Sequence, residues 1–204
     1  LEKQGVKVNL GVDVTAELID SECPDAIVLA TGAIPKKPDY IDTTDERVVS
    51  SWDILGGQVE PVAQKVAVIG GSMLGCEVAE YMADQGNLIS VIKMRPGAEM
   101  AEDCEPTNRR GLLDSLNECR VNFLSGFNVE GLGADGLKLV QRDSGEERTL
   151  EAETVVLALG ARPERNLIDH LKKAEIEFHP IGDCRQPKNI RQAIYEGALI
   201  GRQI

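Results

Sequence analysis

Aromatic residues are scarce in this sequence and make up only 3% of its 204 residues. Proteins that bind single-stranded nucleic acids stack the bases on aromatic side chains, so this composition argues against that class. Basic residues are also outnumbered, with 22 Lys and Arg against 34 Asp and Glu and a net charge of −12. Because this charge repels a phosphate backbone, we expect no nucleic-acid partner, and a phosphorylated ligand would need a local basic patch.

Long apolar runs and paired cysteines are lacking as well. No run approaches the roughly 20 apolar residues that a transmembrane helix needs, so we expect no membrane segment. The five cysteines are scattered along the sequence without a CxxC pair. This pattern is neither a disulfide framework nor a zinc site, and it predicts a protein of the reducing cytoplasm.

Short apolar runs alternate with helix-compatible segments in the middle of the sequence. Runs at 65–69, 88–93 and 120–124 are separated by predicted helices at 73–86 and 107–118. This order predicts a β–α–β–α–β unit built on a parallel sheet. The segment that follows, up to residue 150, has short alternating runs joined by glycine-containing turns, which predicts a three-stranded antiparallel β-meander.

Two similar apolar segments, IVLATG at 27–32 and VVLALG at 155–160, flank this middle part. Each is an apolar run that ends in glycine, as expected of strands buried on both faces. A further short strand is expected at 6–10. We therefore predict an α/β fold with a Rossmann-like parallel sheet, in which a middle domain is inserted into a second one. The middle domain comprises residues 58–152, and the second comprises 1–57 and 153–204.

The strongest chemical signal is a glycine-rich turn between the strand at 65–69 and the following helix. It is Gly70-Gly71-Ser72-Met73-Leu74-Gly75. In a dinucleotide-binding turn the first glycine allows the bend, the second lets the backbone approach the pyrophosphate, and the third lets the helix pack closely. Gly70 and Gly75 fit the first and third positions, whereas Ser72 stands at the second. The turn predicts nucleotide binding, and the alternative is a turn that needs glycine only for packing.

The end of the next strand bears on the choice of nucleotide. An acidic residue there usually accepts hydrogen bonds from the ribose 2′-hydroxyl of NAD. Here the strand ends in Lys93 and Arg95 instead. Two cations suit a 2′-phosphate, so these residues favour NADP(H) over NAD(H), unless they are only solvated surface charges. The acidic run at 99–105 is expected to form a solvated loop.

The whole chain, with IVLATG, the glycine turn, VVLALG and Gly182-Asp183 in this order, resembles a known protein region. It is similar to the C-terminal FAD- and NAD(P)-binding region of NADH:flavin oxidoreductases related to 2,4-dienoyl-CoA reductase, 2-enoate reductase and trimethylamine dehydrogenase. Their fold is like that of pyridine nucleotide-disulphide oxidoreductases. The resemblance implies an NAD(P)-binding domain at 58–152 inserted into an FAD-binding domain.

The resemblance also implies roles for residues outside the glycine turn. Ala30-Thr31-Gly32 and Leu159-Gly160 would be the two crossovers between the FAD and NAD(P) domains. Gly182-Asp183 would hold the ribityl–phosphate part of FAD, and the backbone at Asn189-Ile190-Arg191 would face the flavin. In the intact protein, NAD(P)H would pass hydride to FAD for the reduction of an enoate, an enoyl compound or a similar organic substrate.

The departures from the family pattern matter equally. Its first glycine turn, which holds the ADP part of FAD, would lie upstream of Leu1, as would the barrel with FMN and an iron–sulfur cluster. We therefore expect a fragment that holds FAD weakly, does not turn over alone and exposes an apolar face at IVLATG and VVLALG. We expect that face to be covered by a partner chain, such as a second copy of this one, or to make the fragment prone to aggregation.

Two further functions stay open. The site could bind ADP without taking part in catalysis, as in amine dehydrogenases of this kind, because Ser72 and the missing acid also fit a degraded site. A disulfide reductase is disfavoured, because such an enzyme needs the paired cysteines that this sequence lacks.

Overall fold

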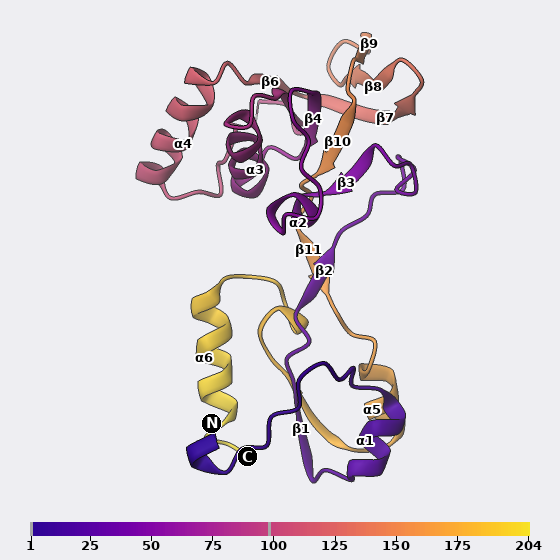
Figure 1. Cartoon of the computed structure of the whole chain (residues 1–204), viewed down its shortest axis with the longest axis vertical. Helices are drawn as coiled ribbons and strands as arrows, with labels where there is room; N and C mark the ends of the chain where they lie inside the picture. Colours follow the sequence, from indigo (N-terminus) through magenta and orange to yellow (C-terminus); the bar gives the residue numbers. More distant parts are fainter. Residues whose placement is uncertain (1, 98) are drawn as a thin grey trace. The chain divides into compact units, whose positions relative to one another are not determined.

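The computed structural model describes residues 2–97 and 99–204, shown in Figure 1. The chain forms two compact units. Unit 1 comprises Leu1–Ile34 and Ala161–Ile204, and unit 2 comprises Pro35–Gly160. Unit 2 is thus larger than the middle domain expected at 58–152. The difference arises because strands on both sides of that range belong to its central sheet.

The central sheet of unit 2 has five parallel strands in the order β3-β10-β4-β5-β6. The strands are β3 (Val48–Ser50), β4 (Lys65–Ile69), β5 (Leu88–Lys93), β6 (Asn122–Ser125) and β10 (Thr154–Leu157). The parallel sheet and the α/β class predicted from the sequence are confirmed. β10 lies between β3 and β4, so VVLALG is buried inside the sheet and the prediction that it is exposed is wrong.

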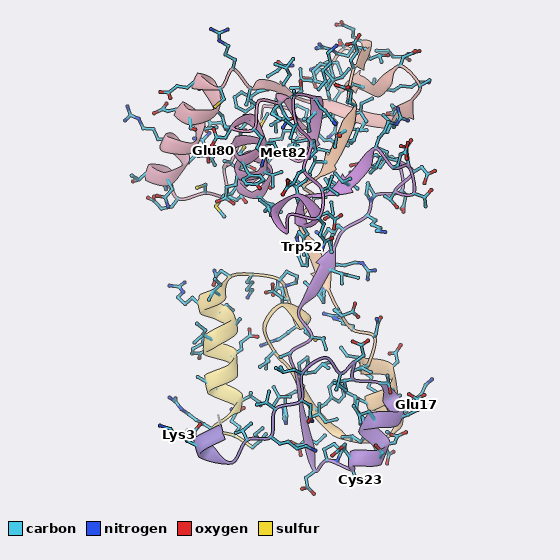
Figure 2. All side chains as sticks on the ribbon, viewed as in Figure 1. Lys3, Glu17, Cys23, Trp52, Glu80 and Met82 are labelled. Atoms are coloured by element: carbon cyan, nitrogen blue, oxygen red, sulfur yellow. The ribbon has the colours of Figure 1, made fainter. Side chains whose placement is uncertain are left out.

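Three helices pack on one face of this sheet: α2 (Ser51–Leu55), α3 (Met73–Ala83) and α4 (Pro106–Glu118). Val66 and Val68 of β4 point into the core that these helices share, together with the fully buried Met82 of α3, labelled in Figure 2. α4 begins one residue earlier than expected, because the Glu105 carboxylate accepts hydrogen bonds from the first free amides of the helix.

The antiparallel meander covers the other face of the sheet. It consists of β7 (Phe127–Gly133), β8 (Gly136–Gln141) and β9 (Glu147–Leu150). Ala67 and Ile69, which alternate with Val66 and Val68 along β4, share a core with Leu137 and Leu139 of the meander. Because successive side chains of a strand point to opposite faces, β4 is buried from both sides and unit 2 has three layers.

Unit 1 is built on a two-stranded parallel sheet of β1 and β12. Its small core includes Ile19, Leu29, Leu171 and Cys184. The elements are η1 (Glu2–Gln4), α1 (Ala16–Glu22), β1 (Ala26–Leu29), β2 (Ala33–Pro35), β11 (Ala161–Pro163), α5 (Ile168–Lys173), β12 (Glu177–Pro180), η2 (Gly182–Cys184) and α6 (Ile190–Ile200).

Two strand predictions fail in unit 1. Residues 6–10 form no strand, because none of the described residues pairs with them, and the Leu10 side chain is 87% exposed. IVLATG is not buried on both faces, because Val28 of β1 is 38% exposed. A parallel pair of strands needs cover on both faces to exclude water, and unit 1 as described covers β1 only in part.

Candidate functional site

The glycine turn has the geometry that a dinucleotide-binding turn requires at its first and third glycines. Gly70 has a φ of +124°, and a Cβ placed on it would lie 2.3 Å from the carbonyl oxygen of Ala158. A Cβ on Gly75 would lie 1.7 Å from the carbonyl oxygen of Gly70. No side chain fits at either position, so α3 begins directly against β4 and the end of β10.

Ser72 occupies the position of the second glycine. It is the N-cap residue of α3, with extended backbone, and its side chain makes no capping hydrogen bond. The hydroxyl is therefore not needed to begin the helix, and it is a suitable donor to an oxygen of a bound phosphate. Leu74, two residues on, packs against the core on the helix side of the sheet.

An acidic side chain already lies at the start of α3. The Asp103 carboxylate accepts a hydrogen bond of 2.7 Å from the backbone amide of Met73, the first residue of the helix. Amides at a helix N-terminus, with the partial positive charge there, are the groups that bind a pyrophosphate in this fold. Asp103 thus places a protein carboxylate on one of these amides.

The two cations at the end of β5 are also paired. The side chains of Lys93 and Arg95 both contact the Glu102 carboxylate, and the Lys93 ammonium lies 3.6 Å from it. Lys93 also donates a hydrogen bond to the backbone carbonyl of Glu99. The cations predicted to receive a 2′-phosphate are therefore brought together at the turn, and both contact a carboxylate that the sequence analysis left in a solvated loop.

The loop at 99–103 is packed on the turn through its two apolar residues, whereas its acidic residues are exposed, as expected of a solvated loop. Met100 is 8% exposed and Ala101 is fully buried, and the Ala101 amide donates a 2.9 Å hydrogen bond to the Gly71 carbonyl. Arg109 of α4 binds the Met100 carbonyl and the Glu99 carboxylate, each at 2.8 Å. The apolar pair Met100-Ala101 between acidic residues is the sequence signal that indicates this packing.

The two predicted crossovers run through paired strands. Ala30-Thr31-Gly32 leads into β2, Leu159-Gly160 leads into β11, and β2 pairs with β11. Thr31 donates a 2.9 Å side-chain hydrogen bond to the Glu164 carbonyl, and the Glu164 amide donates one of 3.0 Å to the Gly32 carbonyl. These bonds fix the path of the chain where it leaves β1.

The predicted FAD residues in the C-terminal part meet at the start of α6. The Asp183 carboxylate accepts a hydrogen bond from the Lys188 amide at 3.1 Å, and the Asn189 side chain caps α6 through the Gln192 amide at 3.0 Å. Ile190, the first residue of the helix, is 79% exposed. The structure therefore brings Gly182, Asp183, Asn189 and Ile190 into one short segment around η2.

Glu196 organises this segment and was missed by the sequence analysis. Its carboxylate accepts hydrogen bonds from the Gln192 side chain at 2.9 Å and from the Gly182 amide at 2.7 Å. These bonds lower the pKa of Glu196 below its usual value. The residue is only 8% exposed, and through these two hydrogen bonds its carboxylate holds the Gly182-Asp183 turn against α6.

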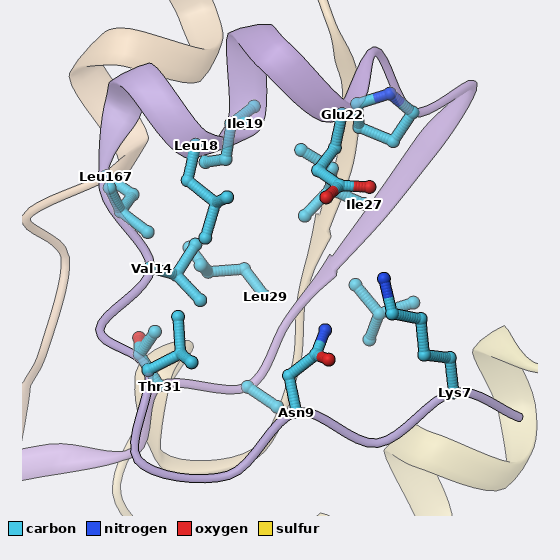
Figure 3. A pocket seen from close by; sticks show the side chains of 14 residues that line it. Lys7, Asn9, Val14, Leu18, Ile19, Glu22, Ile27, Leu29, Thr31 and Leu167 are labelled. Carbon is cyan, nitrogen blue, oxygen red and sulfur yellow. The ribbon is translucent and has the colours of Figure 1, made fainter.

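Unit 1 also contains a largely apolar pocket of about 680 Å³, shown in Figure 3. Val14, Leu18 and Leu29 line it, and Lys7 and Asn9 lie at its polar edge. Ala30 and Thr31, two of the predicted site residues, also border the pocket. The expectation that a partner chain, such as a second copy, covers this side of β1 stays a prediction.

The cysteines do not form a redox pair. All five are free, and Cys76 and Cys184 are fully buried. Burial raises the pKa of the Cys76 thiol to about 11, so it is not poised as a thiolate. In the part of the chain that the structure describes, no group of three or more His, Cys, Asp or Glu side chains could hold a metal ion. No helix among these residues is long and apolar enough to cross a membrane.

The glycine turn and the parallel sheet around it are typical of dinucleotide-binding domains. Residues 1–194 match the family model described as pyridine nucleotide-disulphide oxidoreductase. The chain therefore belongs to this family. The match extends through both units and includes every residue predicted to bind a nucleotide.

Individual relatives refine this assignment. The chain is 32% identical over 208 residues to the NADH oxidase of Thermoanaerobacter brockii, covering 100% of this chain and 32% of that protein. It is 26% identical to the cinnamate reductase of Clostridium sporogenes, and the match covers 100% of this chain and 30% of that protein. A solved structure of 2-naphthoyl-CoA reductase with 2-naphthoyl-CoA matches with a TM-score of 0.87 and 28% identity, again covering 100% and 30%.

The chain thus spans about a third of the length of these relatives. They confirm the resemblance to flavin oxidoreductases of the 2-enoate reductase kind that the motifs indicated. The chain is a flavoprotein-type oxidoreductase region with a nucleotide-binding, Rossmann-like fold.

Proposed function

We propose that unit 2 binds a pyridine dinucleotide at the glycine turn, with the pyrophosphate over Ser72 and the start of α3. The observation that carries this proposal is the backbone of the turn, because neither Gly70 nor Gly75 has room for a Cβ. Ser72 contributes a hydroxyl that the helix cap does not use. The family match supports the same role, since its description names pyridine nucleotides.

In the intact protein, we propose that this unit delivers reducing equivalents to FAD held by unit 1 together with a further part of the protein, which we also propose. A nicotinamide dinucleotide supplies hydride, and the protein positions it and tunes its surroundings. Gly182-Asp183 and the start of α6 are suited to a ribityl–phosphate chain, because Glu196 holds the Gly182 amide and Asp183 holds the Lys188 amide ahead of α6. FMN and an iron–sulfur cluster belong to the proposed missing part.

The organic substrate is proposed from the relatives alone. Cinnamate reductase and 2-naphthoyl-CoA reductase are named for unsaturated acids or their CoA esters. An enoate or enoyl compound is therefore the substrate class we propose for the intact protein. The free cysteines support the cytoplasm as its location.

A titration of the chain with NADH, NADPH and ADP by calorimetry tests the proposed nucleotide site. We expect both dinucleotides to bind more tightly than ADP, because the nicotinamide half adds contacts beyond the phosphates. Failure of all three to bind would contradict the proposed site. Scattering data collected on the same sample show whether the chain is a single species during the titration.

A second function, binding of ADP without catalysis, is favoured by Ser72, which stands at the second-glycine position of the turn as expected of a degraded dinucleotide site. The Asp103 carboxylate does not separate the two functions, because the pyrophosphate that it opposes is common to ADP and the dinucleotides. Equal affinities for ADP, NADH and NADPH would support this function, because they would show that the nicotinamide half adds no contact.

A further inference from the structure

We propose that Glu102 is the residue that selects between the two pyridine dinucleotides, favouring NAD(H) and opposing NADP(H). The proposal rests on the nucleotide site proposed above and deepens it. It also reverses the preference suggested by the sequence, where Lys93 and Arg95 stand without an acid. In the folded chain a carboxylate from the following loop takes the place of the acid that the strand lacks.

The position of Lys93 ties the end of β5 to the glycine turn. A Cβ on Gly71 would lie 2.9 Å from the Lys93 Cβ, so the stem of Lys93 packs directly on the turn. Its side chain is only 11% exposed, and the ammonium is directed to the Glu99 carbonyl and the Glu102 carboxylate. The end of β5 therefore lies beside the turn, where this fold places the ribose next to the adenine.

Glu102 is held at this place by its neighbour in the chain. Ala101 is fully buried, and its amide is bonded to the Gly71 carbonyl. The residue before Glu102 is thus bonded to the turn, and this bond holds the Glu102 backbone near it. Its side chain, 40% exposed, pairs with Lys93 and Arg95 and keeps part of its carboxylate open to solvent.

The 2′-hydroxyl of NAD(H) and the 2′-phosphate of NADP(H) would interact differently with Glu102. A 2′-hydroxyl can donate a hydrogen bond to the Glu102 carboxylate, as it does to the acid at a strand end in NAD-binding sites. A 2′-phosphate carries close to two negative charges, and Glu102 would repel it. The phosphate could reach Lys93 and Arg95 only by displacing Glu102 from both. Glu102 therefore favours the binding of NAD(H) and opposes the binding of NADP(H).

The test is Glu102→Gln in the chain, with calorimetric titrations of NADH and NADPH under identical salt and pH. Glutamine has the same size but no charge, so Lys93 and Arg95 become available to a phosphate. We expect the wild-type chain to bind NADH more tightly. We expect the variant to shift the ratio of the two dissociation constants toward NADPH by about tenfold or more, the effect of one charge-assisted contact.

Two control variants separate selection from other effects. Glu118→Gln, at the exposed end of α4, makes the same change in net charge at the far end of a 13-residue helix and should leave the ratio unchanged. Asp103→Asn should alter both affinities in parallel, because the pyrophosphate is common to the two ligands. Circular dichroism and thermal unfolding verify that each variant is folded.

The outcomes distinguish this inference from the proposed function. If Glu102→Gln binds both dinucleotides with the wild-type ratio, or if Glu118→Gln shifts the ratio equally, Glu102 does not select the ligand and the inference is overturned. If the folded wild-type chain binds neither dinucleotide, the nucleotide site itself is rejected, and the inference with it. A wild-type preference for NADPH that Glu102→Gln does not increase also overturns the inference.

Discussion

The Asp103 carboxylate accepts a 2.7 Å hydrogen bond from the backbone amide of Met73, at the start of the helix that follows the glycine turn. An anionic ligand at this helix end has to share the amides with that carboxylate or displace it. Asp103→Asn keeps an oxygen acceptor but removes the charge. We expect it to tighten binding of NADH and NADPH by about two- to fivefold, the usual effect of one charge at a helix end.

Calorimetry with both dinucleotides at low and moderate salt measures this effect. The gain should be smaller at higher salt, because mobile ions screen the charge of Asp103. An equal loss of affinity for both ligands would contradict the prediction and would show that Asp103 supports the site instead of competing for it.

Ser72→Leu should block the proposed nucleotide site without unfolding unit 2. The second position of the turn is where the backbone approaches the pyrophosphate, and a leucine side chain would fill that space. We expect affinities for NADH, NADPH and ADP to fall by about tenfold or more. The melting temperature should change little, because Ser72 makes no capping bond. Ser72→Ala is the matched control, since it removes the hydroxyl without adding bulk.

Gly75→Ala should strongly destabilise unit 2, because the new methyl group would lie 1.7 Å from the carbonyl oxygen of Gly70. Backbone has to move to relieve this clash, and we expect a loss of about 3 kcal/mol or more in unfolding free energy. Gly111→Ala in α4 is the control, since a Cβ there meets nothing within 4 Å. It should stabilise the chain by about 0.5–1 kcal/mol in urea unfolding.

Glu196 should make the stability of unit 1 depend on pH in the acid range. Its hydrogen bonds to Gln192 and Gly182 lower its pKa in the folded state below the value of 4.5 for a free glutamate. The unfolded chain therefore binds more protons near that pH. The stabilisation is fully present above the unfolded pKa and is lost as the pH falls through the folded pKa.

Glu196→Gln should remove this contribution, so its unfolding free energy should fall less steeply below pH 5 than that of the wild type. Urea unfolding at several pH values, read by circular dichroism, measures the two slopes. Glu118→Gln serves as the control for loss of a carboxylate elsewhere. Identical slopes for wild type and Glu196→Gln would contradict the prediction.

Four of the five cysteines should fall into two groups by reactivity toward a thiol reagent, and Cys104 is of intermediate exposure. Cys23 and Cys119 are exposed and should react rapidly in the folded chain. Cys76 and Cys184 are fully buried, and the pKa of Cys76 is raised to about 11, so both should react only on unfolding. Mass spectrometry of the labelled peptides after brief exposure identifies which have reacted. Rapid labelling of Cys76 would contradict the burial of α3 against the sheet.

Much of the fold could be predicted from local pattern. The strands at 65–69 and 88–93, the helix after the glycine turn and the meander follow from apolar periodicity and glycine positions, which are properties of neighbouring residues. The predictions of a strand at 6–10 and of an IVLATG strand buried on both faces were wrong, although these segments are as apolar as the strands that were predicted correctly. Whether such a run becomes a buried strand depends on its partners, and neighbouring residues in sequence do not reveal them.

The sequence by itself determined the class of the protein and the glycine turn that we propose as its nucleotide site, because a tight turn needs glycine and only a few residues can provide it. It also identified Lys93 and Arg95 at the end of the strand. Only the tertiary structure revealed that Glu102 pairs with Lys93 and Arg95 and that Asp103 reaches back to the start of α3. Electrostatic interaction depends on distance in space, and the fold brings to the site charges that lie up to 30 residues further along the chain.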